Sequence, residues 1–96
     1  MPSADVQVTV TFLGLVRDQM GAPRLEVSVP KGSAMEQLLQ ALAPVVEDKL
    51  GDWAWDRKGR CFTSRVTVAR VSPVAGKGDP LMEGEEVIVF PPMAGG

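Results

Sequence analysis

The sequence predicts an α+β fold in which one main helix lies across a mixed sheet of four to five strands, forming two layers around one core. Three patterns indicate this class. Apolar and polar residues alternate over residues 6–12 and 24–29, as in half-buried strands. A helical pattern of apolar residues, spaced i, i+3, i+4 and i+7, follows these runs. Four consecutive apolar residues then lie near the end of the chain, as in a strand covered on both faces.

Length and composition limit the classes of protein to consider. A chain of 96 residues suits one domain, and 45% apolar with 23% charged residues is ordinary for a soluble globular protein. The net charge of −2 argues against general nucleic-acid binding. The chain contains no histidine, which excludes a Ser-His-Asp triad and a histidine metal site, and we expect no bound metal.

The cysteine content and the N-terminal residues predict the location of the protein. One cysteine cannot form an internal disulfide, which suits a reducing compartment. The first residues show neither a basic region followed by an apolar run nor a membrane span. We therefore expect a cytoplasmic protein that does not associate with a membrane.

The first half of the chain predicts two adjacent strands and the main helix. The residues between the two strands, with Gly14, Gly21 and Pro23, predict a loop. Ser33 and Glu36 have the spacing of a capping box, so a helix is predicted near residues 34–43. Its apolar stripe consists of Met35, Leu38, Leu39 and Leu42, and Pro44 ends it or begins a short second helix.

The second half predicts two further strands, near residues 61–70 and 86–90, and a short one near 71–75. An irregular loop over residues 51–59 carries Trp53 and Trp55. Because residues 87–90 are apolar on both faces, we expect the last strand centrally, beside the first. Its second face is either covered, for example by the tryptophan loop, or exposed as a surface for a partner.

Several charged or reactive residues allow a functional and a structural interpretation. Five bases occur without an intervening acid and indicate either a patch for an acidic partner or RNA, or a solvated loop and outer strand face; the second is favoured. A structural role is likewise favoured for Cys61, and a solvated turn for the three glutamates near residue 84. The five bases are Arg57, Lys58, Arg60, Arg65 and Arg70, and the three glutamates are Glu83, Glu85 and Glu86.

The last six residues predict an extended tail, so the chain divides into a domain over residues 1–90 and a tail over residues 91–96. Pro91 and Pro92 cannot continue a strand ladder and favour a stiff, extended exit. Side chains shrink from Met93 to Gly95 and Gly96, and six residues reach at most about 20 Å. A frayed terminus is one interpretation. The other is a probe for a narrow tunnel, whose only chemistry would be that of the Gly96 carboxylate.

The ending Glu-Glu-Val-Ile-Val-Phe-Pro-Pro-Met-Ala-Gly-Gly, over residues 85–96, resembles that of the MoaD/ThiS family of ubiquitin-like sulfur carriers. Within this family it is most similar to the MoaD branch, the small subunits of molybdopterin synthase. The resemblance also covers the N-terminal Val-Thr-Phe strand, the helix near residue 34 and Asp79-Pro80-Leu81 before the last strand. It implies a ubiquitin-like β-grasp fold with a flexible C-terminal diglycine tail.

The resemblance also implies a function, in which the chain is no enzyme by itself and binds no cofactor. An ATP-using, ubiquitin-activating-like adenylyltransferase would adenylate the Gly96 carboxylate, and sulfur would displace the adenylate to give a thiocarboxylate. The tail would enter the molybdopterin synthase large subunit and donate sulfur to a pyranopterin precursor. Gly95 and Ala94 would pass through the tunnel, while the partner would contact Phe90, Pro91, Pro92 and Met93.

Three other functions stay open. Relatives with diglycine tails serve thiamin or cysteine synthesis, tRNA thiolation or conjugation to protein lysines, so the chain could be a protein modifier or a carrier for another pathway. It could also be a β-grasp interaction module with an incidental tail. In each case the activating machinery lies elsewhere, because Gly76-Lys77-Gly78 lacks the spacing and the Ser/Thr ending of a P-loop.

Overall fold

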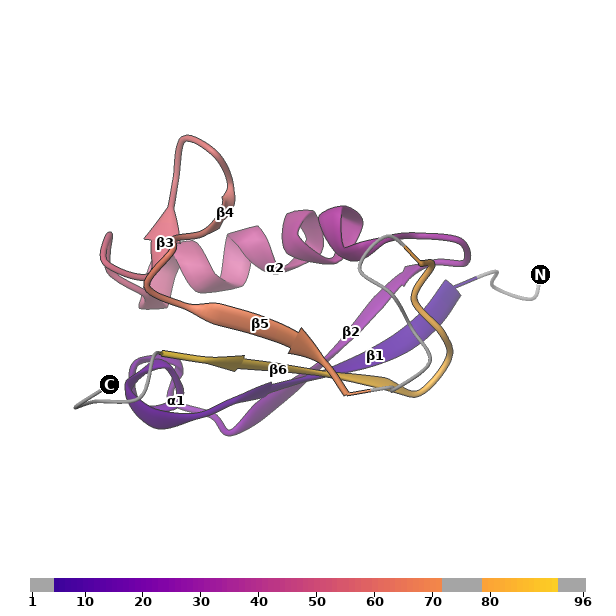
Figure 1. Cartoon of the computed structure of the whole chain (residues 1–96), viewed down its shortest axis with the longest axis horizontal. Helices are drawn as coiled ribbons and strands as arrows, with labels where there is room; N and C mark the ends of the chain where they lie inside the picture. The colour runs from indigo at the N-terminus through magenta and orange to yellow at the C-terminus, as the bar shows by residue number, and fades with distance from the viewer. Residues whose placement is uncertain (1–4, 72–78, 92–96) are drawn as a thin grey trace.

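Four strands form one mixed sheet in the computed structural model, which describes residues 5–71 and 79–91. The strands lie in the order β2-β1-β6-β5 (Figure 1). Their bounds are β1 (Asp5–Phe12), β2 (Arg24–Pro30), β5 (Thr67–Arg70) and β6 (Glu85–Phe90). β1 pairs antiparallel with β2 and parallel with β6, which pairs antiparallel with β5. The predicted central place of the last strand, beside the first, is confirmed.

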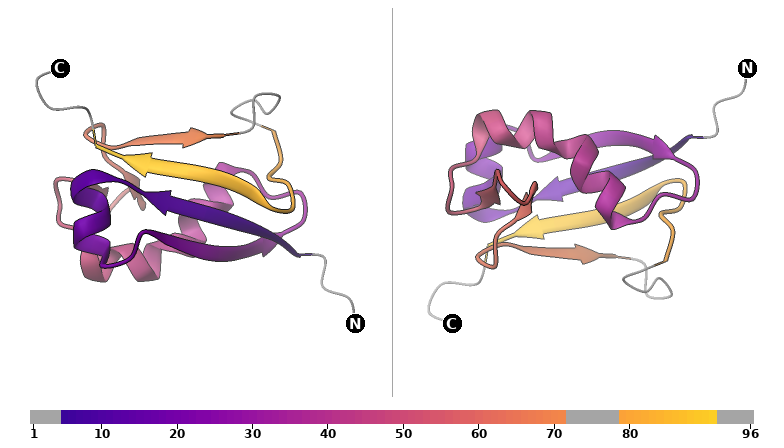
Figure 2. Two further views of the ribbon diagram at one scale, coloured as in Figure 1. Left: turned by 90° about the horizontal axis from the view of Figure 1, so that it is seen from below. Right: turned by 90° about the horizontal axis from the view of Figure 1, so that it is seen from above.

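Helix α2 (Met35–Lys49) crosses one face of this sheet, as predicted, but it is longer than the sequence pattern suggested (Figure 2). It continues through Pro44, whose side chain is exposed. Leu42, Ala43 and Val46 on either side of Pro44 are buried against the sheet. Their packing offsets the backbone hydrogen bond that a proline removes from a helix.

The start of α2 also differs from the predicted capping box. Ala34 is the N-cap, and its N–H donates to Oε1 of Gln37 at 2.8 Å. Ser33 lies one residue earlier and is buried, and its carbonyl accepts a hydrogen bond from the Leu81 N–H at 2.7 Å. The reciprocal contact of a capping box is therefore made by Gln37, not by the predicted Glu36.

A second helix, α1 (Gly14–Met20), occupies the segment for which a loop was predicted. Val16 and Met20 are buried in the core, so one side of α1 contributes to it. The helix ends at Gly21, whose φ of 75° is left-handed and whose N–H donates to the Arg17 carbonyl at 3.0 Å. No side chain caps its first turn, which explains why the start signal was missed.

The predicted strand over residues 61–70 is divided into two. Strand β4 (Cys61–Phe62) pairs antiparallel with β3 (Trp55–Asp56) in a separate hairpin. A turn then follows, in which the Val66 N–H donates to the Thr63 carbonyl at 3.1 Å, and β5 begins at Thr67. The suggested strand near residues 71–75 lies mostly outside the described residues.

The core lies between the sheet and α2, and Trp55 is part of it with 1% of its surface exposed. Its ring meets that of Phe62 edge-on, with centroids 4.9 Å apart. The hairpin of β3 and β4 is on the same side of the sheet as α2 (Figure 1). The tryptophan segment therefore does not cover the second face of β6, and that alternative is wrong.

A helix that packs across a mixed sheet, with the first and last strands parallel at its centre, is the arrangement of the β-grasp fold. The predicted fold class is thus confirmed, with α1 and the β3–β4 hairpin as additions. Within the described residues, no helix has the length and apolar character needed to cross a membrane.

Candidate functional site

The candidate site begins where β6 ends, at the base of the predicted tail. β1 and β6 run side by side in the same direction (Figure 2), so their ends lie together near α1. The N–H of Leu13, the residue after β1, donates to the Val89 carbonyl at 3.0 Å. This bond extends the parallel pairing by one step. The last residues of β6 are therefore held from the β1 side as well as by β5.

Gly14 allows the chain after β6 to pass close to the start of α1. Its φ of 62° is left-handed, a conformation that favours glycine. A Cβ atom at this position would lie 3.2 Å from Cγ of Pro91. Gly14 therefore serves both a turn and a close contact, and it sets where Pro91 leaves the sheet.

The two segments that meet at this exit carry apolar residues. Leu13 and Leu15, on either side of Gly14, are 43% and 50% exposed. Phe90 and Pro91 are half-buried. We call these four residues the tail-base surface. Exposed apolar groups that lie together are typical of protein contact sites.

Phe90 belongs to the open face of the sheet, not to the core. Val87 and Val89 point toward α2 and are fully buried, whereas Ile88 and Phe90 alternate with them and are half-buried. In the register with β5, Ala69 is opposite Ile88 and Thr67 is opposite Phe90. The second face of β6 thus carries apolar groups that α2 and the β3–β4 hairpin leave accessible.

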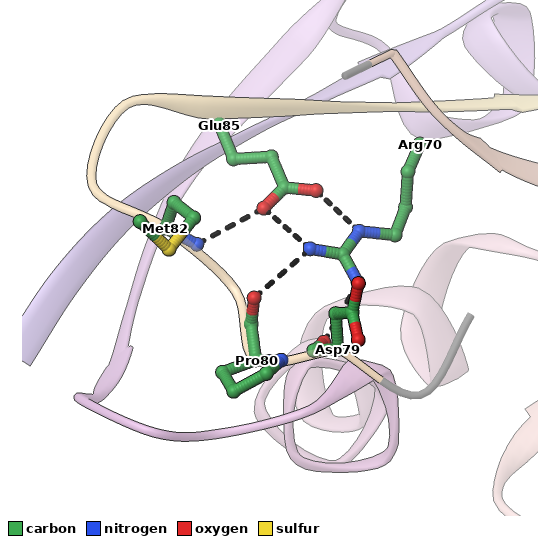
Figure 3. Close-up of polar contacts among 5 residues, drawn as sticks. All are labelled: Arg70, Asp79, Pro80, Met82 and Glu85. Carbon is green, nitrogen blue, oxygen red and sulfur yellow. Dashed lines mark hydrogen bonds and ion pairs between the residues drawn. The ribbon is translucent and has the colours of Figure 1, made fainter. Parts of the chain in front are cut away.

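At the opposite end of β6, Glu85 and Arg70 form a buried ion pair (Figure 3). Nη2 of Arg70 donates to Oε1 of Glu85 at 2.7 Å, and the two side chains are 6% and 2% exposed. The hydrogen bonds from Arg70 lower the pKa of the Glu85 carboxyl below its ordinary value, against the opposing effect of burial. The predicted solvated positions of Glu85 and Arg70 are therefore wrong, and both residues have a structural role.

The other residues of the predicted charged sets are mostly where the sequence placed them. Arg57, Lys58, Arg60 and Arg65 are exposed on the β3–β4 hairpin and the turn after it. Cys61 is half-buried in β4. Glu83 is exposed, and Glu86 is partly buried and accepts a hydrogen bond from Thr11 Oγ1 at 2.8 Å.

The predicted site residues are therefore described only in part. Phe90 and Pro91 lie together at the end of β6, beside α1. The predicted tail residues Pro92, Met93, Ala94, Gly95 and Gly96 lie outside the described residues. Sequence reasoning missed Leu13, Gly14 and Leu15, although two leucines beside a glycine in an expected loop were a usable signal.

Comparison with known proteins places the fold among small ubiquitin-like proteins. No family model matches the chain, and no curated protein matches it. The crystal structure of small archaeal modifier protein 1 from Haloferax volcanii aligns with a TM-score of 0.71 at 22% identity, over 94% of this chain and 99% of that one. The solution structure of small archaeal modifier protein 1 from Methanosarcina acetivorans aligns with a TM-score of 0.63 at 17% identity, over 96% of this chain and 98% of that one.

A neighbour with a different name also appears besides the modifiers. A Pyrococcus furiosus protein provisionally identified as molybdopterin converting factor, subunit 1, aligns with a TM-score of 0.63 at 20% identity, over 92% of this chain and 99% of that one. These alignments span nearly the whole of each chain, so the likeness is one of complete folds. The chain therefore shares the ubiquitin-like β-grasp fold with small archaeal modifiers and with this molybdopterin-related protein.

Proposed function

We propose that the chain acts as a sulfur carrier, thiocarboxylated at Gly96. In this proposal it is the small subunit of a molybdopterin synthase and donates sulfur for the molybdenum cofactor in the cytoplasm. One observation carries the proposal: the Pro-Pro-Met-Ala-Gly-Gly segment directly follows β6, a central strand of a β-grasp sheet. Because β6 is paired on both sides, the tail starts from a rigid platform.

The tail chemistry requires help from another protein. A carboxylate is a poor electrophile, so an oxygen of the Gly96 carboxylate would attack the α-phosphorus of ATP and release pyrophosphate. Hydrosulfide would then attack the acyl carbon and release AMP, leaving the thiocarboxylate. The sequence has no P-loop of its own, and we therefore assign this activation to a separate adenylyltransferase.

The tail-base surface is suited to the mouth of a partner's tunnel. Leu13, Leu15, Phe90 and Pro91 would pack around the mouth of the large subunit's site, while Pro92, Met93 and Ala94 pass inward. Gly95 and Gly96 have no Cβ, so a tunnel that admits only backbone could accept them. Docking of this surface would fix how deep the reactive carbon reaches.

A second candidate function is conjugation to proteins, which the names of the small archaeal modifiers among the structural neighbours favour. Both functions share the adenylate at Gly96. They differ in the attacking group, because a lysine amine would displace AMP to form an isopeptide bond. Carriers for other sulfur pathways would share the thiocarboxylate and differ only in the acceptor.

Intact-mass spectrometry of the protein isolated from its own cells tests these candidates. The sulfur-carrier proposal predicts a chain ending at Gly96, part of which carries one sulfur in place of oxygen. Higher-mass conjugates that digest to a branched diglycine on lysine would favour the modifier. A chain that shows neither species, before and after incubation with ATP and cell extract, would contradict both.

A further inference from the structure

A groove between α2 and the edge strand β5 is not used by the proposed function. The groove has a volume of about 400 Å³, and Arg70 also lines it. Its apolar floor consists of side chains from α2, β4, β5 and the turn before β5: Met35, Leu39, Cys61, Phe62, Val66 and Val68. The groove continues toward the hairpin tip, where a wider space of about 960 Å³ is bordered by Lys58 and Arg60. The two spaces share Met35, Leu39 and Cys61, so they form one surface, which we call the α2–β5 groove.

One wall of the α2–β5 groove is the free edge of the sheet. The Val71 N–H donates to the Glu86 carbonyl at 3.1 Å, next to the pair of Arg70 and Val87. Main-chain groups alternate between the two sides of a strand, so Ala69 faces β6 and Val68 turns its N–H and carbonyl to the outside. Among the described residues, nothing pairs with these two groups of Val68. Such an edge is suited to adding an extended segment.

The hairpin end of the groove is lined by two bases, Lys58 and Arg60, while Asp56 at the hairpin accepts a hydrogen bond from the Lys58 N–H at 3.0 Å. Within the described part of the chain, Lys58 and Arg60 form no ion pair, whereas the neighbouring Arg57 lies 3.7 Å from Asp52. Arg60 has a φ of 54°, a backbone conformation that favours glycine. Glu36 is the acid that borders this space, on the α2 side. Two cations therefore face solvent beside an apolar floor.

We propose that the α2–β5 groove binds an extended, acidic segment of a partner protein. Alternate apolar side chains of the segment fill the floor, its main chain pairs with Val68, and its carboxylates lie over Lys58 and Arg60. A second copy of this chain is disfavoured because it would bring two basic rims together. Single-stranded RNA is disfavoured because Phe62 is the aromatic residue on a floor that is otherwise aliphatic.

The inference goes beyond the proposed function, because the groove lies on the α2 side of the sheet and Phe90 on the other face. A direct test uses the full chain and the amidated peptide Asp-Glu-Val-Thr-Ile-Thr-Val-Glu-Asp, labelled with fluorescein. Acids at both ends make the test independent of the direction in which the peptide lies. The matched control peptide has lysine in place of every acid.

Fluorescence anisotropy measures binding, and the rate of alkylation of Cys61 by iodoacetamide reports occupancy of the groove. Cys61 is the one cysteine of the sequence, so the alkylation signal has a single source. We expect the acidic peptide to bind and to slow alkylation at saturation at least about fivefold, since it covers the thiol. The lysine peptide is expected to bind at least about tenfold more weakly.

Two variants test the rim and the edge. The double variant Lys58→Glu, Arg60→Glu is expected to weaken binding at least about tenfold. The control Arg17→Glu, Arg24→Glu makes the same change in charge at exposed positions outside the groove, and should stay within about twofold of wild type. Val68→Pro removes an N–H that the sheet does not use, and should weaken binding about tenfold while circular dichroism stays native. If Val68→Pro does not fold, Leu39→Asp replaces it, with the same expected loss.

Several results would overturn the proposal. These are absence of binding or of Cys61 protection, equal binding of the lysine peptide, and unchanged affinity of the Lys58→Glu, Arg60→Glu variant. A concentration-dependent dimer that protects Cys61 without peptide would assign the groove to a second copy, and protection by a uridine oligonucleotide would assign it to RNA. Deletion of Gly96 should leave peptide binding unchanged, which separates this inference from the tail chemistry.

Discussion

The guanidinium of Arg70 contacts the carboxylate of Glu85 through both Nε and Nη2, although the two residues are not direct partners in the sheet. Arg70 also donates to the carbonyls of Asp79 and Pro80, at 2.7 and 3.0 Å, and Glu85 accepts from the Met82 N–H at 3.0 Å (Figure 3). The pair thus fixes the connection that leads into β6.

Arg70→Met should lower the free energy of unfolding by about 3–5 kcal/mol, because Glu85 would stay buried without its partner. The double variant Arg70→Met, Glu85→Leu should recover part of this loss, since it removes the buried charge as well. Urea unfolding followed by circular dichroism measures both values in a double-mutant cycle. A loss below about 1 kcal/mol for Arg70→Met would contradict the role given to the pair.

The lowered pKa of Glu85 predicts a pH dependence of stability. Its folded pKa lies below its unfolded value because the charged form is hydrogen-bonded by Arg70, so the pair stabilises the fold above the unfolded pKa. This contribution is lost as the pH falls from about 4.3 through the lower folded pKa. The stability difference between wild type and Glu85→Gln should therefore shrink over this range. The exposed control Glu26→Gln should show a difference near zero throughout.

Substitution of Gly14 should disturb the tail more than the fold. Gly14→Ala places a Cβ atom 3.2 Å from Pro91 and adds the strain of a left-handed residue, at a cost of about 1–2 kcal/mol. The matched control is Gly21→Ala, at the other end of α1, where φ is 75° and nothing lies within 4 Å of the added atom. Both variants should lose similar stability in thermal unfolding. Only Gly14→Ala should also slow sulfur transfer, and equal transfer rates would refute its role at the exit.

Phe90→Asp should leave the domain folded and abolish binding of the large subunit, because the side chain faces the open side of the sheet. An aromatic anchor in an interface typically contributes about 2 kcal/mol or more. Val89→Asp, one residue earlier, should unfold the domain, since Val89 is fully buried. Ser28 is exposed on β2, on the same open face, and Ser28→Asp should change neither the folding of the domain nor its binding of the large subunit. Calorimetric titration with circular dichroism of each variant would show whether a folded Phe90→Asp still binds.

The sequence predicted the strands well where one face alone is buried, because Val6, Val8 and Val10 repeat with the period of a strand. It also located β6 correctly, since a central strand is apolar on both faces. The failures have local causes. Phe62, Val66 and Val68 share one face of the strand predicted over residues 61–70, but Ser64 interrupts that face. The chain turns there, at Thr63, whose Oγ1 donates to the Trp53 carbonyl at 2.6 Å. That contact joins two separate segments of the chain, so it produces no periodic pattern from which the turn could be predicted.

The sequence predicted the tail residues of the candidate site, but it did not predict the residues of β1 and α1 at the base of the tail. The Phe-Pro-Pro and Gly-Gly residues have a chemical meaning that needs no tertiary contact. The roles of Leu13 and Gly14 depend on β1 and β6 ending together, which is a property of the parallel pairing. The buried place of Arg70 was missed for the same kind of reason, because its partner Glu85 lies 15 residues away.

The central claim is that the Gly96 carboxylate is the reacting group. The measurement is intact mass after incubation with ATP, the adenylyltransferase and a sulfide donor, for wild type and for three variants: Gly96 deleted, Gly95→Val, and one alanine appended. An added residue displaces the carboxylate by about 3.3–3.6 Å, and misplacement by about 1 Å can cost on the order of 100-fold in rate. The account predicts sulfur-for-oxygen exchange in wild type and its collapse in all three variants, with unfolding temperatures unchanged. Exchange at the wild-type rate in all three would contradict it.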